Sequence, residues 1–292
     1  MAQITTGEVT LEYETSGSPA AAPLLLVPGF GAQLIAWPRA FCERLAAGGR
    51  FVIAFDNRDC GLSTKLDGRP ADIQAIGAAA GAGDFARARE LAPYTLSEMA
   101  ADAVGLLGEL GIGRAHVLGA SMGGMIAQTM AIEHPQSLLS LTSMMSSTGE
   151  PEYGRPTEEA LQALLTPAPA DRAGYIAAAE TSLIWRSRRY PELEAVRCLA
   201  GESYDRCYEP AGVSRQLAAM IASEPRAEQL RHLDVPTLVI HGLDDTLIAP
   251  SGGERTAALI PGARLRLFED MGHDRPEPLW PELCDAILEH TA

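Results

Sequence analysis

The chain has 292 residues, of which 47% are hydrophobic, and its formal net charge at pH 7 is −15. This length suits one large domain, or one core with an inserted piece. The acidic balance argues against nucleic acid and anionic membrane surfaces as partners, because both attract basic proteins. The five cysteines are odd in number and include no C-x-x-C pair, so we expect no disulfide framework, no metal site and a cytoplasmic protein. No apolar run approaches the ~20 residues that a membrane span needs, and the first residues lack a signal-peptide pattern.

The N-terminal part of the chain predicts strands and one clear helix. Alternating apolar and polar residues over 4–13 predict an antiparallel hairpin. A short apolar strand follows in 23–31 and ends in a glycine loop. A helix is expected over 37–50, and a second buried strand with a polar loop over 51–63. Residues 66–94 are rich in Ala and Gly and predict an extended loop with some helix.

The rest of the chain predicts helices that alternate with buried strands. The helix expected over 95–111 begins with a capping signature, Thr95 or Ser97 followed by Glu98. A strand, a serine and an apolar helix follow one another within 116–131. Further strands are expected at residues 137–147, 235–245 and 263–273, before a final helix at about 278–290.

Buried strands that alternate with helices predict an α/β fold. The central sheet should be mostly parallel, with helices on both faces. The alternation breaks over 149–231, which holds Pro-bounded helical pieces and no convincing strand. We therefore expect a core of residues 1–148 and 232–292, with a helical cap insertion over the carboxyl ends of the strands.

One serine stands at the corner where a buried strand becomes a helix. Ser121 lies between Gly119 and Gly123 in the pattern G-x-S-x-G. A plain turn of small residues explains this pattern, and so does a nucleophile elbow, which holds the serine oxygen up on a strained turn. Ligands of open α/β sheets bind at the carboxyl ends of strands, and Ser121 is at such an end.

A serine hydroxyl needs a base before it becomes a good nucleophile. Histidine titrates near neutrality and can take the proton and return it. Ser121 is followed by an aspartate pair in the loop after residue 242, and only His273 and His290 lie beyond that pair. His290 is near the C-terminus on a helix tail, so His273 is the expected base.

A buried carboxylate would fix the ring tautomer of the base and stabilise the imidazolium. Two aspartates, Asp244 and Asp245, follow a predicted strand, and Glu150 follows the preceding one. We favour Asp245 as the acid and keep Asp244 as the alternative.

Two backbone N–H groups should stabilise the oxyanion. Met122 follows the serine, and Phe30 lies in the glycine loop after the first buried strand, where Pro28 has no N–H. Gly29 and Gly31 would let the backbone approach a substrate. Simple turn chemistry is the alternative for this loop.

The expected cap is rich in aromatic residues. Trp185 and Tyr175 are the candidates to contact substrate, although such aromatics more often pack the small core of the cap itself. Elsewhere, Arg58 and Asp59 predict a local ion pair or turn, and His241 a structural residue. The aromatic residues of the cap are Tyr153, Tyr175, Trp185, Tyr190, Tyr204 and Tyr208.

These motifs together resemble the α/β-hydrolase superfamily over essentially the full length. The matching pieces are "LLLVPGFG", "FDNRDCGLS", "LGASMGG", "LVIHGLDDTLIAP" and "MGH". "VPGFGAQLIAWPRAF" is similar, more narrowly, to the esterase group that contains aclacinomycin methylesterase. The resemblance implies a Ser-His-Asp triad at Ser121, His273 and Asp245, no cofactor, and hydrolysis of a carboxylic ester. Many members have His-Gly where this chain has Pro28-Gly29, and Gly-His-Ser where it has Ala120 before the serine.

The sequence thus predicts a serine hydrolase of a small-molecule ester, such as a methyl ester or a lactone. The same triad would serve a perhydrolase, a C–C hydrolase or a lyase, and a non-catalytic small-molecule receptor is the remaining alternative. A homo-oligomer is left open.

Overall fold

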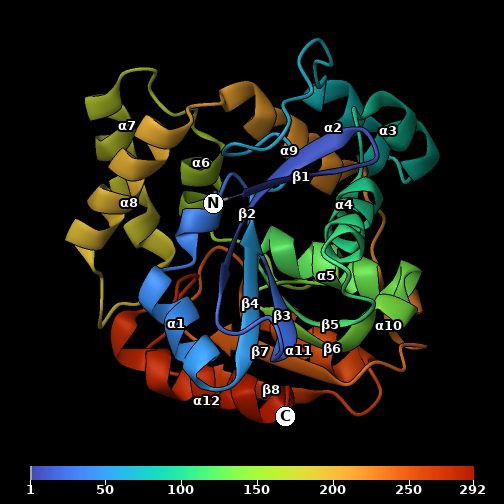
Figure 1. Cartoon of the computed structure of the whole chain (residues 1–292). Coiled ribbons are helices and arrows are strands. Elements are labelled where there is room, and N and C mark those ends of the chain that lie inside the picture. Colours follow the sequence, from blue (N-terminus) through green and yellow to red (C-terminus); the bar gives the residue numbers. More distant parts are fainter. Residues whose placement is uncertain (1) are drawn as a thin grey trace.

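The computed structural model describes residues 2–292, which form one central eight-stranded sheet between layers of helices (Figure 1). The strand order is β1-β2-β4-β3-β5-β6-β7-β8. β1 and β2 form the antiparallel hairpin, β2 also pairs antiparallel with β4, and all remaining neighbours are parallel. The strands are β1 (Ala2–Thr6), β2 (Val9–Ser16), β3 (Ala22–Val27), β4 (Arg50–Phe55), β5 (Ala115–Ala120), β6 (Leu138–Met144), β7 (Thr237–Gly242) and β8 (Arg264–Phe268).

The predicted α/β class with a mostly parallel sheet is confirmed. The α-helices are α1 (Arg39–Ala47), α2 (Ile73–Gly81), α3 (Phe85–Leu91), α4 (Leu96–Glu109), α5 (Met122–Glu133), α6 (Glu158–Leu165), α7 (Arg172–Ala179), α8 (Leu193–Arg206), α9 (Pro210–Ala222), α10 (Ala227–Leu230), α11 (Ser251–Leu259) and α12 (Trp280–His290).

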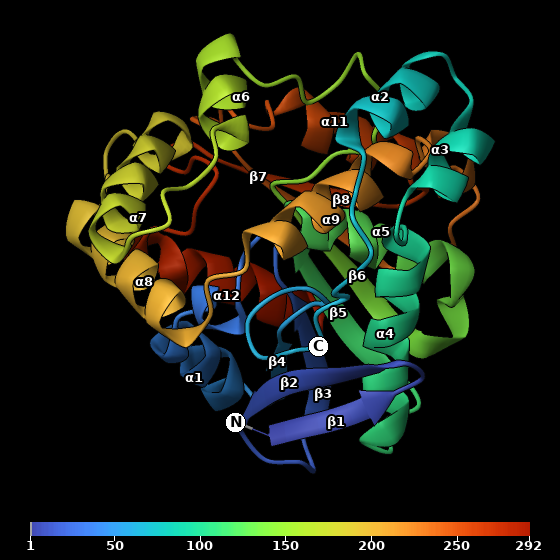
Figure 2. The ribbon, with the colours of Figure 1, turned by 90° about the horizontal axis from the view of Figure 1, so that it is seen from above.

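The inner strands β3, β4 and β5 are largely buried on both faces, whereas the edge strands β1 and β8 are mostly exposed. In β3, Leu25 and Val27 join the core beneath α4 and α5, whereas Leu24 and Leu26 join the core beneath α1 and α12. Figure 2 shows these two helix layers on opposite sides of the sheet. Side chains of a strand alternate between faces, so a continuous apolar run is what a doubly covered strand requires.

The capping signature before α4 is present as predicted. The Thr95 hydroxyl accepts the amide N–H of Ser97 at 3.2 Å, and the Glu98 carboxylate accepts the amide N–H of Thr95 at 2.8 Å. These bonds satisfy backbone donors that the first turn of a helix leaves free.

The Ala/Gly-rich stretch is more helical than expected. Its two short helices, α2 and α3, are capped by Asp72 and Asp84, and each aspartate side chain accepts a backbone amide N–H of the first turn. Ile76 and Ala88 then pack against α9 in a small separate core. Capping and this distant contact supply the stability that the sequence pattern did not indicate.

The segment between β6 and β7 contains α6 to α10 and, among the described residues, no strand. The helices α6, α7 and α8 stand together beside the sheet, and α9 lies across its top (Figure 1). This agrees with the helical character expected of residues 149–231, while the division into core and cap stays a prediction. Within residues 2–292, no helix combines the length and the apolar character that crossing a bilayer would require.

Candidate active site

Ser121 lies at the sharp turn between β5 and α5. Its φ of 57° and ψ of −123° are unusual for a residue with a Cβ. Backbone strain of this kind costs about 1–3 kcal/mol and persists only where the surroundings hold it. Here the Ser121 amide donates to the Met144 carbonyl at 2.9 Å, and the Ser146 hydroxyl donates to the Ser121 carbonyl at 2.8 Å. The end of β6 and the residues that follow it therefore fix the turn.

The glycines beside Ser121 allow close backbone packing. A Cβ at Gly119 would lie 2.0 Å from the Gly123 carbonyl oxygen, and a Cβ at Gly123 would lie 2.1 Å from the Val27 carbonyl oxygen. Any side chain at either position would force the strand and helix apart. The small residues thus serve tight packing and a strained serine at the same time.

We expect Gly123→Ala to destabilise the protein by about 3 kcal/mol or more, because its Cβ would meet backbone atoms of β3. Urea denaturation measures this change. Gly108→Ala is the matched control, since a Cβ there, within α4, meets nothing within 4 Å. Its helical backbone should make alanine neutral or stabilising by about 0.5–1 kcal/mol. Equal effects at the two glycines would contradict the packing argument.

His273 and Asp245 are joined by a short hydrogen bond. Nδ1 of His273 lies 2.7 Å from Oδ2 of Asp245. Oδ1 of Asp245 accepts the backbone amides of Leu247 at 2.9 Å and Ile248 at 2.8 Å. The carboxylate is therefore held by both oxygens, and its orientation toward His273 is fixed.

Two opposing effects act on the pKa of Asp245. Burial of this side chain would raise the pKa, but the facing His273 and hydrogen bonds from His241 and His273 lower it to about 2. The acid is thus ionised at neutral pH. His241 was expected to be structural, and it lies beneath the carboxylate, with Nε2 3.4 Å from Oδ2 of Asp245 and 2.7 Å from the Ile248 carbonyl oxygen.

The other acids considered for this role point elsewhere. Asp244 accepts the backbone amide of Arg188 at 3.1 Å, in the segment before α8. Glu150 pairs with Arg255 through two hydrogen bonds, of 2.7 Å and 2.9 Å. Among the three acids weighed from sequence, Asp245 is therefore the one that the structure brings to His273.

The glycine loop after β3 lies against the serine. A Cβ at Gly29 would be 3.3 Å from Cβ of Ser121. Phe30 follows in this loop, and Met122 opens α5, where the first backbone N–H groups have no intrahelical acceptor. The Gly31 amide, by contrast, donates to Oε1 of Gln216 at 2.9 Å. Gly31 thus faces α9.

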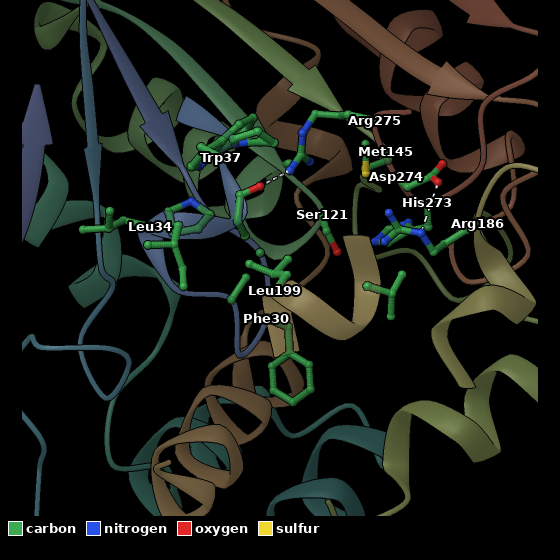
Figure 3. Close-up of a pocket in the computed structure, with 18 of the residues that line it drawn as sticks. Phe30, Leu34, Trp37, Ser121, Met145, Arg186, Leu199, His273, Asp274 and Arg275 are labelled. Carbon is green, nitrogen blue, oxygen red and sulfur yellow. Dashed lines mark hydrogen bonds and ion pairs between the residues drawn. The ribbon is translucent and has the colours of Figure 1, made fainter. Parts of the chain in front are cut away.

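A cavity of about 840 Å³ lies between the strand ends and the helices that follow β6. Ser121, His273, Gly29, Phe30 and Trp185 all line it, and Figure 3 shows the serine and histidine side chains within it. The structure therefore brings together at one cavity the nucleophile and base expected from sequence.

Tyr175 and Gly31, expected to contact substrate, are not among the residues that line this cavity. The ring of Tyr175 packs against Tyr204 and Tyr208, with centroids 5.5 Å and 5.8 Å apart. Tyr175 of α7 thus belongs to a tyrosine cluster with Tyr204 of α8 and Tyr208, which lies between α8 and α9. Tyr175 therefore follows the alternative stated from the sequence, in which the aromatic residues of this segment pack against one another.

Arg58 and Asp59 lie in a turn, which was one of the two expectations, but they do not form an ion pair with each other. Arg58 donates to Asp102 of α4 at 2.6 Å and 2.7 Å, and Asp59 accepts from Arg215 of α9 at 2.7 Å and 2.9 Å. Each residue serves a different helix, so the loop after β4 links α4 to α9.

Sequence reasoning missed several residues of the cavity wall. Trp37, Arg186 and Arg275 line the cavity. The guanidinium of Arg275 lies over the ring of Trp37, 4.3 Å from its centroid. No local motif marks this pair, because the two residues meet only through the tertiary fold.

Comparisons with known proteins agree with this fold. The family model described as alpha/beta hydrolase fold matches residues 22–275. The chain is 33% identical to rhodomycin D methylesterase DnrP of Streptomyces peucetius, over 99% of this chain and 97% of that protein. Rhodomycin D methylesterase DauP of Streptomyces sp. strain C5 is 32% identical over the same shares.

Solved structures show the same architecture. A hydrolase from Pseudomonas aeruginosa PA01 has a TM-score of 0.73 at 25% identity, covering 99% of this chain and 97% of that chain. A thermophilic esterase from Thermogutta terrifontis has a TM-score of 0.72 at 25% identity, covering 100% and 99%. The resemblance drawn from the sequence motifs is thereby confirmed, and the chain belongs to the alpha/beta hydrolase fold family.

Proposed function

We propose that this enzyme cleaves a small-molecule carboxylic ester with Ser121, His273 and Asp245 as its catalytic triad. The observation that carries this proposal is the 2.7 Å bond between His273 and Asp245, at the cavity that also holds the strained Ser121. Full-length similarity to two methylesterases supports ester hydrolysis as the reaction class.

The proposed reaction runs through an acyl-enzyme. His273 takes the proton of Ser121 as its oxygen attacks the ester carbonyl, and Asp245 stabilises the resulting imidazolium. The amides of Phe30 and Met122 would hold the oxyanion. The alcohol leaves with the proton from His273, and a water activated by the same histidine then releases the acid.

The proposed substrate is a methyl ester of a bulky, partly aromatic acid. The cavity volume of about 840 Å³ lies near the upper end of the ~300–1,000 Å³ range of small-molecule sites. Its wall includes the aromatic side chains of Phe30, Trp37 and Trp280. Since the similar proteins are rhodomycin D methylesterases, a rhodomycin-type methyl ester is the first native candidate. A lactone would use the same chemistry.

A series of nitrophenyl esters, from acetate to long acyl chains, tests the reaction. We expect turnover of at least part of the series, together with release of methanol from a bulky aromatic methyl ester. Product analysis distinguishes hydrolysis from perhydrolysis or C–C cleavage by the same residues. If the protein bound such esters without forming any product, the result would contradict the proposed hydrolysis and favour a non-catalytic small-molecule receptor.

We also propose a cytoplasmic location, because the five cysteines are odd in number, include no C-x-x-C pair and are all free in the structure.

A further inference from the structure

Three residues of the cavity wall carry an enclosed nitrogen atom that makes no hydrogen bond to any residue that the structure describes. Among the described residues, few buried side-chain nitrogen or oxygen atoms lack a partner, and three of them belong to cavity-lining residues: Nε1 of Trp37, Nε of Arg186 and Nε of Arg275. All three atoms are donors. Unsatisfied buried polar groups are uncommon in folded proteins and call for an explanation. These atoms are themselves enclosed, and Nε of Arg186 lies 3.4 Å from a carboxylate oxygen of Asp274, so the residue that points to a ligand is Arg275, which is partly exposed in the wall.

Arg275 is the strongest of these groups. Its guanidinium stacks on Trp37 and makes one hydrogen bond to the protein, from Nη2 to the Ala36 carbonyl at 2.7 Å (Figure 3). Within residues 2–292, no carboxylate lies within 4.0 Å of it. Burial and the neighbouring Arg186 charge lower the pKa of Arg275 to about 10, so it remains charged at neutral pH.

The other enclosed charges of the cavity are paired with one another. Nε of Arg186 lies 3.4 Å from Oδ2 of Asp274, and Nη2 of Arg186 lies 3.7 Å from Oε2 of Glu192. Asp274 also accepts the backbone amides of Ser187 and Gly272. These groups compensate each other. The charge of Asp274 also opposes the lowering of the pKa of Arg275 by burial, but among the described residues no carboxylate lies within 4.0 Å of that guanidinium.

Further acidic residues line the cavity at exposed positions, where water screens their charge. These exposed carboxylates therefore do not neutralise the guanidinium of Arg275. These residues are Glu14, Glu202 and Glu277.

We propose that Arg275, stacked on Trp37, forms a subsite for an anionic oxygen of the substrate, separate from the ester that is cleaved. The group recognised would be a carboxylate, or the ionised oxygen of an acidic enol or phenol. This inference rests on the proposed ester hydrolysis. It narrows the substrate to esters that also carry a delocalised negative charge, which a planar guanidinium binds well.

The position of Arg275 suits this role. It lies two residues after His273, and its hydrogen bond reaches Ala36, in the segment between β3 and α1 that also carries Phe30. Arg275 therefore lines the same cavity as the expected base and an expected oxyanion donor. The competing explanation is that Arg275 only clamps these two loops together.

The test compares anionic and neutral esters of matched length. The anionic probes are nitrophenyl monoesters of dicarboxylic acids from succinate to sebacate, and the neutral probes are nitrophenyl alkanoates. We expect Arg275→Met to lower kcat/KM by about 10- to 100-fold for the best anionic ester, mainly through KM. The neutral ester of the same length should change less than about threefold. Arg275→Lys keeps the charge and should restore part of the anionic preference.

Arg87→Met is the matched control for loss of a positive charge. Arg87 belongs to α3, pairs with Glu90 at 2.9 Å and does not line the cavity. Its removal should leave the ratio of anionic to neutral kcat/KM within about twofold. Equal losses for both ester types in Arg275→Met would overturn the subsite and favour the clamp. The absence of any loss for either ester type in Arg275→Met would also overturn the subsite.

A binding measurement separates this inference from the proposed reaction. Calorimetry with Ser121→Ala and the free dicarboxylates requires no turnover. Binding that disappears in Ser121→Ala/Arg275→Gln supports the subsite even if no ester is cleaved, and glutamine keeps an N–H for the Ala36 carbonyl. Binding that persists in the double variant overturns it. Failure of wild type on every ester, with this binding intact, would refute the proposed reaction alone.

Discussion

Replacing Ser121 with alanine is expected to lower kcat for ester hydrolysis by about 10⁵- to 10⁶-fold, as loss of a triad nucleophile does in other serine hydrolases. The fold should survive, because the backbone bonds to Met144 and from Ser146 do not involve the serine hydroxyl. Alanine keeps the same Cβ and meets the same strain at a φ of 57°. The melting temperature should therefore change little while turnover disappears.

Ser147→Ala is the control for removing a hydroxyl from the same cavity. Ser147 lines the cavity but lies beyond the end of β6, outside the strained turn. We expect its kcat to stay within about threefold of wild type. If Ser121→Ala retained full activity, Ser121 would be a turn residue and the proposed mechanism would be wrong.

The fold could be predicted from sequence where burial imposes a simple pattern. β3 and β7 are covered on both faces, so their apolar runs were recognisable. In contrast, α2 consists mainly of Ala and Gly, and Ile76 is its one buried residue, so the sequence of α2 shows no clear apolar period. Its start signal, Asp72, was present but stood outside any apolar period. A helix stabilised by a distant partner leaves little trace in its own sequence.

The residues of the candidate site also fall into two groups: those that the sequence could place and those that it could not. Ser121 and His273 could be placed because each follows a predicted strand, and the carboxyl ends of parallel strands meet at one edge. The choice between neighbouring aspartates depended on rotation of the chain after β7, which the sequence pattern did not determine. Arg275 and Trp37 meet from segments far apart in the chain. Such pairs depend on tertiary packing.

Asp245→Asn is expected to lower kcat by about 10³- to 10⁴-fold, and the hydrogen bonds of the carboxylate give the reason. The amides of Leu247 and Ile248 donate to Oδ1 and would retain the amide oxygen of asparagine. The new NH₂ group would then face Nδ1 of His273 and act as a donor. His273 would have to place its own proton on Nε2, the nitrogen that must accept the serine proton.

Asp244→Asn provides the matched control, one residue away in the same loop. Its carboxylate accepts the Arg188 amide and does not contact His273. We expect its kcat to stay within about fivefold of wild type. The pKa of Asp245 near 2 means that its carboxylate is ionised at any assay pH above about 4, so titration of this acid should not limit the wild-type activity in that range. A large loss in Asp244→Asn together with a small one in Asp245→Asn would reverse the assignment, since the acid that orients His273 would then be the other aspartate.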